Sequence, residues 1–343
     1  MYSRRSCPFH LTLLALALML LGGCKVLGVR TIPLYELKDM YEGPGSRYLE
    51  VDGTKVHYRV EGKGPTLVLL HGVLASLHTW DGWVAKLREH YQVIRLDLPG
   101  FGLTGPMASD DYTPEYAMEF FEKFRVKLAA QCSNCNLEKF HLAGNSLGGF
   151  ISWYYAAHHP EHVDKLIIID PIAYPQKLPF IIKFASGPVF GWWASWQTPR
   201  FIIKRNVRKV YGDPDRVTDE TVDRYHNLLL REGNRESMVK YFRTLKKYST
   251  NTEICKAIPR IKAPTFLMHG EVDRWVPPEL VERWRQDLPG IKIKLYATAG
   301  HIPMEELPEE TVADAFAFLS GGQQIDEAVG NGEAVEKPAM SEW

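Results

Sequence analysis

The sequence predicts an α/β fold in which a mostly parallel sheet is covered by helices on both faces. Short, continuous apolar runs alternate with helix-like stretches, which is the pattern of strands buried on both faces. Each run also ends in a loop or helix rather than in a tight hairpin. The apolar runs are Thr66–Leu70, Gln92–Leu96, Phe140–Ala143, Leu166–Ile169, Thr265–Met268 and Lys292–Tyr296.

The elements around these runs can be placed in order along the chain. Tyr48–Val51 and Lys55–Arg59 flank Asp52-Gly53, a pair typical of a tight turn, so this region predicts a β-hairpin. Amphipathic or apolar patterns predict the helices. The predicted helices are Trp80–His90, Pro114–Ala130, Leu147–His158 and Pro308–Leu319.

The alternation of strands and helices is interrupted once. After Pro171 no strand pattern recurs until Thr265, and the stretch between carries helical patterns, prolines and many aromatic residues. We therefore expect one core, formed by residues 46–172 and 258–320, with a helical cap at 173–257. Residues 321–343 contain five acids and one lysine, and this composition predicts a disordered tail.

The N-terminus reads as an export signal. Arg4 and Arg5 precede Leu11–Leu21, an eleven-residue run that is too short to span a bilayer comfortably. The sequence Leu21-Gly22-Gly23-Cys24 resembles a bacterial lipobox, which implies a signal peptide at 1–23, a lipid on Cys24 and a linker at 24–45. Because Lys25 is not aspartate, we expect the outer membrane of a bacterial cell envelope, facing the periplasm. The alternatives are an ordinary signal peptide and an uncleaved anchor.

Charge and cysteine usage restrict the partners further. Lys plus Arg and Asp plus Glu both number 41, so no polyanionic partner such as nucleic acid is indicated. In an exported protein, Cys132 and Cys135 predict a small disulfide that closes a loop. Two free thiols or a redox pair are the alternatives.

One serine stands in a motif that suits a nucleophile. Gly144-Asn145-Ser146-Leu147-Gly148 fits G-x-S-x-G, which alone is weak evidence. Here it follows an apolar strand directly and opens a helix directly, so a sharp turn would expose the serine under strain, with small neighbours allowing close approach. The context predicts that Ser146 is the nucleophile.

A serine nucleophile needs a base and an acid that orients the base. His301 follows the last predicted strand, and Asp273 follows the strand before it. Asp170 ends another strand and is the rival acid. Asp97 also ends a strand, but the following Leu98-Pro99-Gly100-Phe101-Gly102 indicates a structural turn. The order Ser146, Asp273, His301 predicts the catalytic triad.

The reaction would also need two backbone N–H groups that bind a developing oxyanion. Leu147 directly follows the nucleophile at a helix N-terminus, and Val73 lies in the loop after Thr66–Leu70. These two residues are the predicted oxyanion hole. We expect His71, in the same loop, to pack and form hydrogen bonds.

These motifs together resemble the α/β-hydrolase family over about residues 45–320. The matching segments are His71-Gly72, Asp97 to Gly102, Gly144 to Gly149, Gly270-x-x-Asp273 and Gly300-His301. The resemblance implies an eight-stranded, mostly parallel sheet, a cap after the sixth strand, and neither cofactor nor metal. It excludes relatives with aspartate in place of Ser146, such as haloalkane dehalogenases and epoxide hydrolases.

The resemblance favours a serine hydrolase that cleaves carboxylic ester bonds in a small-molecule ester or lipid. One alternative is a carbon–carbon bond hydrolase of aromatic ring-fission products. Those relatives usually carry tryptophan after the histidine, whereas this chain has Ile302. A second alternative is a non-catalytic lipoprotein that uses the fold as a scaffold.

The cap is rich in aromatic residues between Phe180 and Phe201. We expect these side chains, including Trp192, Trp193 and Trp196, to pack the cap and to wall an acyl pocket. Contact with a bilayer is the alternative, and nearby cations would then face anionic headgroups. Those cations are Lys183, Arg200, Lys204 and Arg205.

Overall fold

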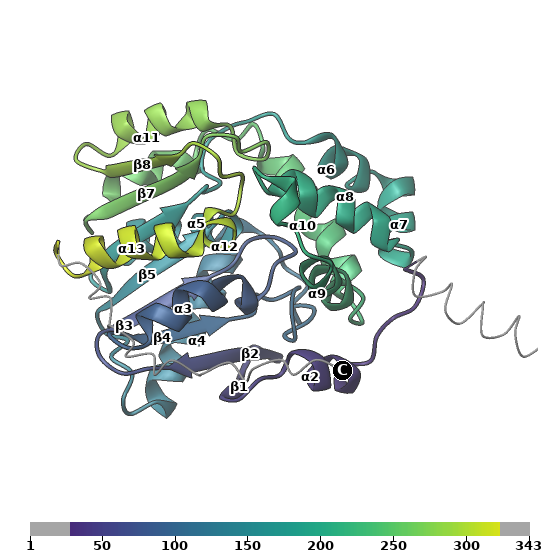
Figure 1. The fold of residues 1–343 in the computed structure, drawn as a ribbon, viewed down its shortest axis with the longest axis horizontal. Coiled ribbons are helices and arrows are strands. Elements are labelled where there is room, and N and C mark those ends of the chain that lie inside the picture. Colours follow the sequence, from purple (N-terminus) through teal and green to yellow (C-terminus); the bar gives the residue numbers. More distant parts are fainter. Residues whose placement is uncertain (1–27, 323–343) are drawn as a thin grey trace, which may run out of the picture.

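A computed structural model describes residues 28–322 and contains one eight-stranded sheet with the order β1-β2-β4-β3-β5-β6-β7-β8 (Figure 1). The predicted signal, the Cys24 lipidation site and nearly all of the predicted tail lie outside the described residues. The strands are β1 (Ser46–Val51), β2 (Thr54–Glu61), β3 (Thr66–Leu70), β4 (Gln92–Leu96), β5 (Phe140–Asn145), β6 (Val163–Ile169), β7 (Thr265–Gly270) and β8 (Lys292–Tyr296).

The sheet confirms the predicted fold class. β1 pairs with β2 and β2 with β4 in antiparallel fashion, and all other pairs are parallel. Asp52 and Gly53, with φ of 46° and 75°, turn the β1–β2 hairpin, as the sequence indicates. All six apolar runs form strands. Three have the predicted bounds, and β5, β6 and β7 extend two or three residues further.

Helices cover both faces of the sheet because alternate strand residues point to opposite sides. Leu67 and Leu69 of β3 pack in one buried cluster with α3 (Asp81–Leu87) and α13 (Pro308–Leu319). Val68 and Leu70 pack in a second cluster with α4 (Pro114–Gln131), α5 (Leu147–His158) and α11 (Val281–Asp287). The short helix predicted from Trp80 begins with a 3-10 turn at Leu77–Trp80. A disulfide joins Cys132 and Cys135 after α4.

The cap lies between β6 and β7 and forms a separate group of helices beside one end of the sheet (Figure 1). Because the parallel strands all point toward that end, the cap covers the loops that follow them. Among residues 28–322, no helix is both long and apolar enough to cross a bilayer. The cap helices are α6 (Phe180–Ala185), α7 (Pro188–Trp196), α8 (Arg200–Val210), α9 (Asp219–Leu229) and α10 (Asn234–Tyr248).

Residues 28–45, which the sequence analysis assigns to a linker, form part of the folded unit. They contain helix α2 (Leu34–Tyr41), and the Ile32 N–H donates to the Leu230 carbonyl at 2.8 Å. Leu37 is fully buried and packs with Leu103 and Leu228. The segment therefore straps the cap to the core. Leu37 is the one buried residue of α2, so a long apolar stripe that would predict this role is absent from the segment.

Replacing Leu37 by alanine should destabilise the whole protein. Truncation of a fully buried leucine typically costs about 2–5 kcal/mol of unfolding free energy. Met40→Ala on the same helix is the matched control, since Met40 is 46% exposed and surface changes usually stay within about 0.5 kcal/mol. Urea unfolding of both variants measures the difference. Equal, small changes in unfolding free energy for the two variants would show that burial of Leu37 in residues 28–45 does not stabilise the fold.

Candidate active site

Ser146 occupies the strained turn between β5 and α5. Its φ of 54° and ψ of −112° are unfavourable for a residue with a side chain, and such strain is typical of functional turns. A Cβ on Gly144 would collide with the Gly148 backbone, and a Cβ on Gly148 would collide with the end of β3. The two glycines therefore allow the turn to be this tight, as the motif predicts.

His301 and Asp273 lie against each other behind this turn. His301 Nδ1 and Asp273 Oδ2 are 2.7 Å apart, and both side chains are buried. The Asp273 carboxylate can only accept, so Nδ1 carries the hydrogen and Nε2 is left as the base. Among the described residues, Ser146 Oγ forms no hydrogen bond to this ring. Such contacts are often long in the absence of substrate.

Asp273 is held in its ionised form. Burial alone would raise its pKa, but the neighbouring His301 and the hydrogen bonds it receives lower the pKa below the usual value. Its second oxygen, Oδ1, accepts from the Trp275 N–H at 2.6 Å and the Val276 N–H at 3.2 Å. The loop after β7 thus fixes the carboxylate that orients the histidine.

The rival acid, Asp170, stands beside Asp273 but has a different environment. One ligand atom from each of Asp170, Asp273 and His301 lies within 4.8 Å of the others. Complete burial and the negative charge of Asp273 raise the pKa of Asp170 well above its ordinary value. Asp170 Oδ1 accepts from the Gly270 N–H at 3.0 Å. These shifts favour the protonated form of Asp170, which supports the loop, and the ionised form of Asp273.

The two predicted oxyanion donors lie on adjoining segments. Val73 belongs to the loop after β3, and Leu147 is the first residue of α5, where helix N–H groups have no helical acceptor. A Cβ on Gly72 would lie 3.0 Å from the Ser146 Cβ, so this loop runs directly beside the nucleophile.

His71 braces the oxyanion loop, as the sequence suggests. The Leu98 N–H donates to His71 Nε2 at 2.9 Å, and His71 Nδ1 donates to the Gly72 carbonyl at 2.7 Å. Burial lowers the pKa of His71 and so favours the neutral ring. A neutral ring can accept a hydrogen bond at Nε2 and donate one from Nδ1 at the same time. Asp97 is likewise structural, since its buried carboxylate lies 2.7 Å from His57 Nδ1.

Two residues that hold the histidine loop are not identified by sequence reasoning. Asn145 Nδ2 donates to the His301 carbonyl at 2.9 Å, which ties the loop to the nucleophile turn. The buried Glu306 carboxylate accepts from the Gly300 N–H at 2.9 Å and from the cap residue Gly212 at 2.9 Å. Asn145 stands at a variable position of its motif, and Glu306 lies in an unremarkable acidic helix, so neither gives a local signal.

An apolar cavity under the cap reaches the site. Val73, Ser146, Leu147 and His301 all line it, so the cavity brings together the residues predicted to be the nucleophile, the base and the oxyanion hole. Its walls are aliphatic and aromatic, and no Lys, Arg, Asp or Glu lines it. The cap contributes apolar side chains to this wall, among them Leu178, Ile182, Ile203, Val207, Phe242 and Leu245.

The expectation that Trp192, Trp193 and Trp196 wall this cavity is wrong. None of the three lines it, and Trp192 and Trp196 are 68% and 52% exposed. The physical reason is that α7 packs on α10 only through one narrow side, and Gly191 is its one buried residue. The wall is formed instead by the inward sides of α6, α8 and α10.

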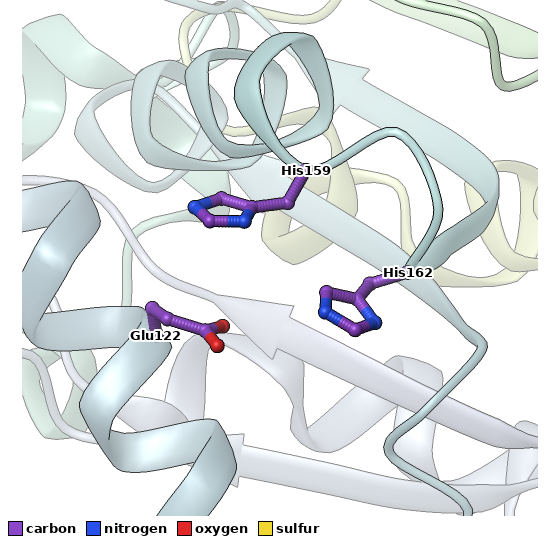
Figure 2. A group of neighbouring side chains, drawn as sticks. All are labelled: Glu122, His159 and His162. Carbon is purple, nitrogen blue, oxygen red and sulfur yellow. The ribbon is translucent and has the colours of Figure 1, made fainter.

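A second group of titratable side chains lies far from this site. Figure 2 shows Glu122 of α4 beside His159 and His162, with one ligand atom from each within 4.8 Å of the others. Arg125 donates to both Glu122 oxygens at 2.7 Å, and the Tyr155 hydroxyl donates to one of them at 2.7 Å. These donors already bind both oxygens of the Glu122 carboxylate. The group therefore links α4 to α5 and gives no reason to assign a metal.

Comparison with known proteins agrees with this geometry. Residues 65–197 match the family described as alpha/beta hydrolase fold. The protein named uncharacterized hydrolase YugF of Bacillus subtilis (strain 168) is 29% identical over 279 residues, which cover 78% of this chain and 96% of the relative. Monoacylglycerol lipase abhd6-B of Xenopus laevis is 25% identical over 294 residues, covering 82% and 83% of the two chains.

A solved structure described as a membrane phospholipase A, a bacterial virulence factor, superposes with a TM-score of 0.70 and 27% identity. The match covers 92% of this chain and 99% of the other. The sheet order, the helical cap and these similarities together show that the chain has the α/β-hydrolase fold.

Proposed function

We propose that this chain is a serine hydrolase of carboxylic esters whose acyl groups are long and uncharged. One observation carries the proposal: the strained Ser146 opens into a cavity lined by apolar side chains, together with His301 and the oxyanion residues. Each CH₂ group buried in such a wall contributes about 0.8 kcal/mol, so the cavity favours extended acyl chains.

The geometry supports a two-step acyl transfer. His301 Nε2 takes the proton of Ser146 as Oγ attacks the ester carbonyl carbon, while Asp273 stabilises the imidazolium. The N–H groups of Val73 and Leu147 donate hydrogen bonds to the negative oxygen of the tetrahedral intermediate. The C–O bond then breaks, and His301 returns the proton to the leaving alcohol. Water, deprotonated by the same histidine, releases the acid from Ser146.

The residues that line the cavity favour ester hydrolysis over the two alternative functions, carbon–carbon bond hydrolysis and a non-catalytic role. A ring-fission product carries carboxylate groups, which need cationic partners, and no Lys or Arg lines the cavity. Ile302, which follows His301, adds a further apolar side chain to the wall. Two of the similar proteins are named for lipids, one as a phospholipase and one as a monoacylglycerol lipase. A purely structural role would not require the strained serine.

We also propose that Cys24 carries a lipid and holds the enzyme in the bacterial cell envelope, at the outer membrane. The support is the lipobox-like Leu21-Gly22-Gly23-Cys24 after a short apolar run. Lipid chains give stable anchoring when two or more act together.

Ser146→Ala should lower the rate of ester hydrolysis by several orders of magnitude with an unchanged melting temperature, because only the nucleophile is lost. The assay uses p-nitrophenyl esters of increasing acyl length together with labelling by a fluorophosphonate probe. Ser109→Ala, at an exposed serine, is the control and should label fully. Stoichiometric labelling of the Ser146→Ala protein would overturn the assignment.

Asp273→Asn should cost on the order of 10⁴ in turnover, because the amide cannot stabilise the imidazolium or fix its tautomer. Asp170→Asn should cost far less, since an amide closely resembles the neutral acid that the structure indicates there. Steady-state kinetics on one ester ranks the two. If Asp170→Asn proves the more damaging change, the roles of the two acids must be exchanged.

Cys24→Ala should leave an unprocessed precursor, because lipidation and cleavage both require the thiol. Intact mass measurement of the protein from membrane fractions decides the matter. A mature N-terminus at any other residue in the unaltered protein would refute lipidation at Cys24.

A further inference from the structure

The cap carries an unusual outer surface. Six large apolar side chains on α6, α7 and the start of α8 are exposed, by 77% for Phe180 and 68% for Trp192. Single exposed apolar residues are normal, but six large ones within 22 residues of one cap segment indicate a contact surface. We call this group the outer cap face. It consists of Phe180, Val189, Phe190, Trp192, Trp196 and Phe201.

The outer cap face is separate from the packing of the cap. On α8, Ile203 and Val207 are 7% and 6% exposed and line the cavity, whereas Phe201 is 65% exposed. On α6, Ile182 lines the cavity, whereas Phe180 points out. The helices therefore have one apolar side for the cavity and a second apolar side for another partner.

The charge around this face indicates what that partner is. Between Asp170 and Asp213 the chain contains seven Lys or Arg residues and no Asp or Glu. Lys183, Arg205 and Lys209 are exposed and form no ion pair with any residue in 28–322. Aromatic residues combined with unpaired cations are typical of surfaces that enter the interface of an anionic bilayer.

The course of the N-terminal segment agrees with this partner. The chain enters the described region at Gly28, whose carbonyl accepts from the Thr198 N–H at 3.1 Å and from Arg235 Nη1 at 2.6 Å. Thr198 comes two residues after α7 ends. Cys24 is four residues before Gly28, and four residues span at most about 14 Å. The chain therefore enters the described fold beside the end of α7, which carries part of the outer cap face.

We propose that the outer cap face lies in the interface of an anionic phospholipid bilayer, with its aromatic side chains among the acyl chains and its cations at the headgroups. Two of the three helices that carry this face, α6 and α8, also wall the cavity, which places the bilayer beside the route to Ser146. The proposed contact with the bilayer depends on the outer cap face alone. The use of this contact to deliver substrate to Ser146 rests in addition on the proposed ester hydrolysis.

The test uses the full-length protein reconstituted in vesicles of phosphatidylethanolamine and phosphatidylglycerol with brominated acyl chains, which quench tryptophan fluorescence at short range. Quenching should be clear for the unaltered protein, and most of it should be lost in Trp192→Ser/Trp196→Ser. Val126→Ser on α4, also exposed, is the matched control and should leave quenching unchanged. Replacing Lys183, Arg205 and Lys209 by glutamine should reduce quenching in anionic vesicles more than in neutral ones.

Activity provides a second, independent readout. The tryptophan variant should hydrolyse a soluble short-chain ester normally but lose most of its activity on phospholipid in vesicles. If no ester is hydrolysed by the unaltered protein, the proposed function fails while quenching still decides the docking. Equal quenching in the unaltered protein and the tryptophan variant would overturn the docking. A dimer in which Trp192 and Trp196 crosslink to a second copy of the chain would also overturn the docking.

Discussion

The rest of the site depends on one backbone constraint, the left-handed conformation of Ser146. This turn is possible only where β5 and α5 approach β3 so closely that Gly144 and Gly148 admit no side chain. The same approach brings the loop after β3, which contains Val73, beside Ser146. The predicted nucleophile and the two predicted oxyanion residues are thus brought together by a single packing arrangement.

The sequence predicts the strands and helices around Ser146 well because their signals are local. Buried strands such as β3 and β4 are continuous apolar runs between breakers, and α5 begins directly after the strained serine. The parts that it does not predict depend on long-range approach. The sequence of Leu34–Tyr41 contains no local pattern that predicts the burial of Leu37 against the cap. Likewise, α7 is apolar on all sides, so its sequence cannot show that Trp192 faces outward.

The two acids show how environment, rather than residue type, assigns a role. Asp170 and Asp273 both end parallel strands and lie within a few ångströms of His301. Two adjacent buried carboxylates cannot both keep their charge at low cost. Asp273 receives two backbone N–H donors and the imidazole, so it stays ionised, and Asp170 takes the proton. The neutral acid therefore helps to confine the negative charge to the residue that touches the histidine.

The joint between cap and core limits how substrate can enter. Glu306 accepts hydrogen bonds from Gly212 of the cap and from Gly300 beside the catalytic histidine, and the His301 N–H donates to the cap carbonyl of Val210 at 2.7 Å. Lifting the whole cap would break these bonds and displace His301 itself. Helices α6 and α7 have no such tie to the histidine loop, because their described contacts are with each other and with α10. The cap is thus tied to the histidine loop at the end of α8 and just after it, and not at α6 and α7, which carry most of the exposed aromatic side chains.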